Sequence, residues 1–194
     1  LWGGAANLTH LVLTSINDDS IDWDEGYVGN IQYALIVQTA NQAKTSNHAF
    51  ELDTKGDAAE SAFQESNPTV ANVTAIASLD DTDLDTANSN VFQGNGINLK
   101  DGSEGRFFNT VLLGDYTNCV YIKDETSYKT DAAAQAAFVN VYGLCDTAVE
   151  DNRGGSAAVE IEAGVATLSD TLAYTGSVTA TIESVEVDGS APAQ

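Results

Sequence analysis

Asn7-Leu-Thr-His-Leu-Val-Leu-Thr-Ser15 is the stretch that decides the fold, because it returns along the chain. A second copy, Asn30-Ile-Gln-Tyr-Ala-Leu-Ile-Val-Gln38, begins 23 residues later, and weaker copies occupy 70–76, 107–113 and 138–142. In every copy the third position, counted from the first apolar residue, is polar. These positions are His10, Tyr33, Asn72, Asn109 and Asn140. A short segment that recurs in this way is typical of a repeat architecture.

A shorter segment with apolar-polar-apolar-polar alternation follows each copy. These segments are Ile21–Asp24, Phe50–Asp53, Ile97–Lys100, Val120–Lys123 and Val159–Glu162. The alternation is the period-two pattern of a strand that buries one face. The two segments are 13 residues apart in the first and fourth units and further apart in between, so the insertions lie in loops.

Five units that cannot bury their own apolar face alone predict a solenoid of stacked coils. An antiparallel sandwich is disfavoured, since two-residue hairpin turns between matching strands are scarce. The sequence therefore predicts an all-β parallel β-helix. In such a stack Asn72, Asn109 and Asn140 would lie above one another as an amide ladder.

The coils are predicted to span residues 1–164. Thr130–Ala137 contains strong helix formers after a Thr-Asp start, which predicts a short helical insertion near 130–137. The alternation changes after Gly164, so 165–188 is expected to form further strands or a capping element. Residues 189–194 are expected to be disordered.

The chain of 194 residues contains 29 Asp and Glu against 7 Lys and Arg, a net charge of −22. This charge repels phosphate backbones and anionic lipids, so nucleic-acid binding is not expected. No apolar run approaches the roughly 18 residues of a membrane span. Because the chain contains no Met, Leu1 is not expected to be the natural start.

Cys119 and Cys145 are the two cysteines. They allow one disulfide, as expected in an oxidising compartment, or two buried free thiols. They are too few for a typical structural zinc site.

The densest polar cluster surrounds the first short segment. If Ile21 and Trp23 point inward, Asp22 and Asp24 point outward, and the next coil adds another outward carboxylate pair. Oxygen ligands at this density suit Ca²⁺. The predicted calcium ligands are Asp18, Asp19, Asp22, Asp24, Glu51 and Asp53. The alternative is a solvated acidic face.

Further along the same outward face come Asn98 and Lys100, and then Tyr121 and Lys123. Lys100 could pair with Asp53, and Tyr121 could act as a stacking platform in a glycan-binding strip. Simple balancing of surface charge is the alternative.

The coil pattern resembles the right-handed parallel β-helix (pectate-lyase-like) superfamily. The segments Leu1–Gly4, Asn7–Thr14 and Asp18–Gly26 are more specifically similar to uncharacterised secreted or lipoprotein β-helix proteins of marine Gram-negative bacteria. The resemblance implies right-handed coils and a secreted or cell-surface location. It establishes no activity.

The functional expectation is a structural or adhesive β-helix protein that binds cations or glycans. Open coil ends would let copies stack end to end into a homo-oligomer or filament. The alternative is a polysaccharide lyase or glycoside hydrolase of the same superfamily. The acidic cluster resembles clustered catalytic aspartates, but no Arg-x-Lys element accompanies it.

Overall fold

In the computed structural model, the described residues are 1–14, 16, 18–38, 48–54, 64–77, 94–114, 116–123, 126–128, 137–153 and 165–167. They form two sheets. The long-strand sheet contains β1 (Leu8–Thr14), β3 (Asn30–Val37), β5 (Thr69–Ile76), β7 (Arg106–Leu113), β9 (Phe138–Leu144) and β11 (Val165–Thr167). The short-strand sheet contains β2 (Ile21–Trp23), β4 (Phe50–Leu52), β6 (Ile97–Leu99), β8 (Asn118–Ile122) and β10 (Thr147–Asp151).

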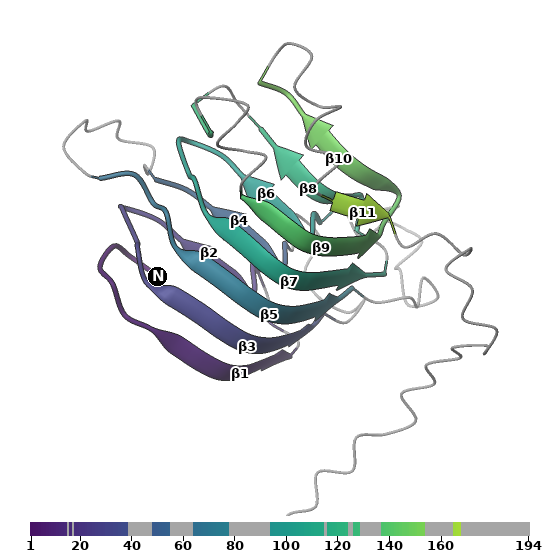
Figure 1. Ribbon diagram of the computed structural model, residues 1–194, viewed down its shortest axis with the longest axis horizontal. Helices are drawn as coiled ribbons and strands as arrows, with labels where there is room; N and C mark the ends of the chain where they lie inside the picture. The colour runs from purple at the N-terminus through teal and green to yellow at the C-terminus, as the bar shows by residue number, and fades with distance from the viewer. Residues whose placement is uncertain are drawn as a thin grey trace, which may run out of the picture.

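Successive strands of the chain alternate between the two sheets, and every pairing within a sheet is parallel. Figure 1 shows the resulting stack, with the short strands behind the long ones. The backbone of the connections also pairs between coils, as in the hydrogen bond from Asn67 N to Tyr27 O (3.1 Å). The prediction of an all-β parallel β-helix is therefore confirmed.

The coil interior is filled from both sheets. Ile21 and Trp23, Phe50 and Leu52, Ile97 and Leu99, and Val120 and Ile122 are all buried, as the alternation predicts. Aromatic rings cross the interior: Trp23 stacks on Phe107 with ring centroids 6.1 Å apart, and Phe107 stacks on Phe138 at 5.8 Å. The Trp23 indole is satisfied as well, since Nε1 donates to Ser103 Oγ (2.9 Å).

Strands β1, β3, β5, β7 and β9 bend at the polar position that the repeat identifies, which is His10, Tyr33, Asn72, Asn109 or Asn140. All five residues there have a left-handed backbone conformation, with φ between 49° and 59°. Asn109 Nδ2 donates to Asn72 Oδ1 (3.3 Å), and Asn140 Nδ2 donates to Asn109 Oδ1 (3.1 Å). His10 and Tyr33 continue the column as stacked rings with centroids 5.1 Å apart. The predicted amide ladder is confirmed, and the bend explains why Asn suits three of its rungs, because Asn tolerates positive φ better than most residues.

The fifth short strand differs from the prediction. The strand that pairs with β8 is β10, in which Val149 lies beside Val120. The predicted segment Val159–Glu162 is therefore not the partner of β8, and it lies outside the described residues. β10 was missed because its second inward position is the charged Asp151 instead of an apolar residue.

Asp151 is accommodated by a buried ion pair. Its Oδ2 lies 2.7 Å from Arg153 Nη2, and the two side chains are only 2% and 6% exposed. Arg153 Nη1 also donates to Tyr128 O (2.7 Å). Hydrogen bonds and charge from Arg153 lower the pKa of Asp151, although burial alone would raise it.

A disulfide joins Cys119 of β8 to Cys145, which lies between β9 and β10, with Cα atoms 5.5 Å apart. This pairing confirms the disulfide alternative. Gly143 makes room for the bridge, because a Cβ at that position would lie 2.0 Å from Cys119 Sγ.

Other expectations fall largely outside the described residues. These are the helix near 130–137, most of 165–188 and the tail 189–194. Within 165–188, Val165–Thr167 does form a strand, β11, which continues the long-strand sheet beyond β9.

Candidate functional site

Two columns of side chains lie on the outward face of the short-strand sheet, and we call them the polar strip. The first column is Asp22, Glu51, Asn98, Tyr121 and Glu150, which the strand register places side by side. The second is Asp24, Asp53, Lys100, Lys123 and Asn152, each the residue immediately after its strand. The alternation of the short strands forces these residues outward because their neighbours fill the core.

Lys100 is the centre of the acidic half of the strip. Its Nζ lies 3.0 Å from Glu51 Oε1 and 3.2 Å from Asp53 Oδ2. Burial lowers the pKa of Lys100, but the hydrogen bonds and charges of the two carboxylates outweigh this effect and hold the pKa above its usual range. Burial raises the pKa of Asp53 to about 7, with Lys100 acting in the opposite direction. The predicted pairing of Lys100 with Asp53 is present.

Asp19 and Glu51 are neighbouring carboxyl groups next to this centre, close enough to affect the pKa of Asp19. Asp19 Oδ1 also accepts a hydrogen bond from His48 N (2.7 Å). Burial is the main cause that raises the pKa of Asp19 to about 8. The charges of Glu51 and Asp18 act in the same direction, and the hydrogen bond from His48 N acts against it. A pKa this high favours the protonated form of Asp19 at neutral pH.

His48 lies beside this pair and is 5% exposed. Its Nδ1 accepts a hydrogen bond from Asn95 N (2.7 Å), which fixes the ring as an acceptor at that atom. Burial lowers the pKa of His48 to about 4, so the ring is neutral at pH 7. Sequence reasoning missed this residue because a long insertion separates it from Asp19, and no local pattern brings the two together.

The six residues predicted to bind calcium lie on two coils and at their corner. Asp18 and Asp22 are exposed, Asp19, Asp24 and Glu51 are half-buried, and Asp53 is 9% exposed. Within the part of the chain that the structure describes, no group of three or more His, Cys, Asp or Glu is placed to hold a metal ion. Lys100 already neutralises Glu51 and Asp53. The calcium site therefore stays a prediction.

Two buried acceptor atoms in the strip have no hydrogen-bond partner, Asp53 Oδ1 and Asn98 Oδ1. Asn98 is 5% exposed, and its Nδ2 lies 3.5 Å from Glu51 Oε1. An unpaired buried acceptor is costly, so both atoms would gain from a hydrogen-bond donor.

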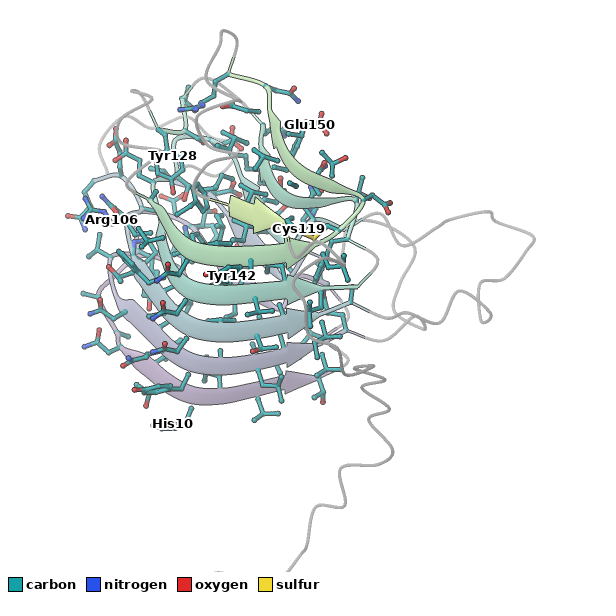
Figure 2. All side chains as sticks on the ribbon, turned by 45° about the vertical axis from the view of Figure 1, so that its right-hand side comes forward. His10, Arg106, Cys119, Tyr128, Tyr142 and Glu150 are labelled. Atoms are coloured by element: carbon teal, nitrogen blue, oxygen red, sulfur yellow. A yellow bond between two sulfur atoms is a disulfide. The ribbon has the colours of Figure 1, made fainter. Side chains whose placement is uncertain are left out.

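The other half of the strip is aromatic and polar. Tyr121 is half-buried, and its hydroxyl accepts a hydrogen bond from Asn152 Nδ2 (3.1 Å). Glu150 is held by Asn118 Nδ2, 3.2 Å from Oε2, and stays exposed at the end of the strip, where Figure 2 labels it. Tyr121 is therefore fixed in position between charged and amide side chains.

Comparison with protein families finds that residues 1–184 match the pectate-lyase-like β-helix domain. The chain belongs to this family. The match covers most of the chain, from its first residue to a point beyond β11. No curated protein and no solved structure matches it.

The disulfide of the β-helix domain is typical of an oxidising, extracellular-type compartment. None of the described segments is a helix long and apolar enough to cross a membrane. The family assignment gives the fold and leaves the activity to be argued from the polar strip.

Proposed function

We propose that this β-helix domain is part of a secreted or cell-surface adhesive scaffold that binds glycans along its polar strip. The observation behind the proposal is the position of Tyr121, which stands in register between Asn98 and Glu150 and is held by Asn152. A sugar ring can stack on an aromatic face while its hydroxyl groups bond to neighbouring polar side chains. Stacking of copies end to end into a filament is part of the same proposal.

The rigid coil geometry supports this reading. The strip side chains project from paired strands, and a site on strands is held more precisely than one on loops. Parallel strands lie about 4.8 Å apart, so five coils offer a strip about 20 Å long, which is enough for several sugar rings. The acidic half would disfavour polyanionic glycans unless a cation such as Ca²⁺ bridges them.

Binding of a panel of neutral and acidic polysaccharides, measured by calorimetry with and without Ca²⁺, tests the proposal. Tyr121→Ala should weaken binding about two- to tenfold, since an aromatic contact contributes about 0.5–1.5 kcal/mol. Tyr33→Ala is the matched control, because Tyr33 is an exposed tyrosine on the other sheet. Equal binding by both variants, or no binding to any glycan, would reject the proposal.

The alternative is a polysaccharide hydrolase or lyase, and the protonated Asp19 beside Glu51 favours it. A carboxyl group that keeps its proton near pH 7 can act as a general acid. Incubation with the same polysaccharides should then produce new reducing ends for hydrolysis or unsaturated ends for elimination. Loss of such turnover in Asp19→Asn would place Asp19 in the reaction, whereas absence of turnover in the wild type would leave binding alone.

A further inference from the structure

The long-strand sheet has an apolar outer surface beyond the bend. Inward positions there are filled by core residues such as Ile36 and Leu112, both 0% exposed, so the alternate side chains point out. We call this surface the outer facet. It consists of Val12, Thr14, Leu35, Val37, Thr74, Ile76, Val111, Leu113, Tyr142 and Leu144. Val12 is 69% exposed and Leu144 is 48% exposed, and Tyr142 is labelled on this side in Figure 2.

The outer facet is also free of charge. Strands β1, β3, β5, β7 and β9 contain no Asp, Glu or Lys, and Arg106 lies at the start of β7, before the bend. This is unusual in a chain that contains 29 Asp and Glu. The acidic side chains that the structure places on strands are on the short-strand sheet instead. The two outward faces of the coil are therefore chemically different.

We propose that the outer facet is a contact between two copies of this chain, packed facet to facet about a twofold axis. Two parallel sheets with repeating side chains pack well against each other at about 10 Å. The charge distribution favours a second copy packed in this orientation, because it keeps the two acidic strips apart. Each acidic strip lies on the sheet behind the facet, so two layers or more, at least about 20 Å, separate the strips. That distance exceeds the screening length of about 8 Å at physiological salt.

Other occupants fit the charge pattern less well. A basic partner would be attracted to the acidic strip instead of the uncharged facet, and an anionic membrane is repelled by a net charge of −22. Packing of two copies strip against strip would bring their carboxylates together.

The size of the facet determines how strongly the proposed dimer is expected to associate. Five strands at about 4.8 Å and four residues at about 3.3 Å give a footprint of about 300 Å² per copy. This is below the roughly 800 Å² per partner of a stable complex, so the dimer should be weak and concentration-dependent. Salt should strengthen it, because salt screens the repulsion between the two acidic copies.

Sedimentation velocity at protein concentrations from about 10 to 500 µM, at low and high NaCl, tests this proposal. The wild type should shift from monomer toward dimer with concentration, and further in high salt. Leu35→Glu places a charge in the facet and should keep the chain monomeric. Gln32→Glu is the matched control, because it adds the same charge to the same strand on the other side of the bend and should still dimerise.

Circular dichroism and melting show whether each variant is folded, and the more exposed Val12→Glu replaces Leu35→Glu if the latter is not. A wild type that stays monomeric at every concentration overturns the proposal, as does equal dimerisation of both Glu variants. A mass that grows past the dimer in an open series would assign association to the coil ends instead. Glycan binding at the strip is measured separately, so the two proposals can fail independently.

Discussion

At Asp19, burial and the charges of neighbouring carboxylates both raise the pKa. The neighbouring carboxylates are those of Glu51 and Asp18. An unfolded Asp has a pKa near 3.9, whereas the folded pKa of Asp19 is about 8. The folded state therefore binds more protons than the unfolded state between these two values.

This difference predicts how stability depends on pH. Because the folded state holds the extra proton, the free energy of unfolding should fall as the pH rises from about 6.5 to 8. Asp53, with a pKa of about 7, contributes in the same direction. His48 has the opposite sign, but it acts between its folded pKa of about 4 and its unfolded value of 6.5, below this window. Asp19→Asn should therefore flatten the decline, as measured by urea unfolding at each pH.

Asp18→Asn is the control for that experiment. It removes a carboxyl group from the neighbouring exposed position and leaves the carboxyl group of Asp19 in place. An equal flattening in both variants would mean that general charge reduction, and not the buried proton, causes the effect.

At the scale of elements, the disulfide fastens β8 to the segment between β9 and β10, and so holds two successive coils together. Breaking it frees the unfolded chain from a closed loop, since the two cysteines are 26 positions apart. In the chain-entropy account, closing a loop of this size stabilises the folded state by about 3–4 kcal/mol relative to the unfolded chain.

Cys145→Ser together with Cys119→Ser should therefore lower the melting temperature clearly, and a reducing agent should have the same effect on the wild type. The double variant should be insensitive to the reducing agent. A wild type that melts unchanged under reducing conditions would contradict this expectation.

The sequence predicts the strands well because each has a strict pattern. The alternation of Ile21 and Trp23 or of Phe50 and Leu52 directly indicates which side chains are inside. β10 was missed where the pattern is interrupted by Asp151, whose burial depends on Arg153. Likewise, the strip could be predicted from alternation, and the predicted calcium ligands include both Asp19 and Glu51. The position of His48 beside Asp19 could not be predicted, since a long insertion separates the two residues.

For the molecule as a whole, the net charge of −22 is distributed unequally between two faces. Within the acidic half of the strip, Lys100 relieves repulsion by pairing with Glu51 and Asp53. The effect of cations on the melting temperature therefore tests whether the acidic half of the strip binds them.

Calcium should raise the melting temperature more than NaCl of equal ionic strength if the acidic half of the strip binds it. A chelator should then reverse the difference. Combining Asp22→Asn with Asp24→Asn should reduce it, because both carboxylates lie in the predicted site and neither contacts Lys100 in a salt bridge. Equal melting in CaCl₂ and NaCl would mean that screening alone accounts for the effect of salt.

The bridge between Cys119 and Cys145 has a consequence for a chain that is cut. Lys123 is exposed and lies inside the closed loop, so trypsin cleavage after it would leave both fragments covalently joined. On a gel the nicked protein would run as one band until the disulfide is reduced. Within this loop, the β-helix domain can lose the continuity of its backbone and still keep its coils attached.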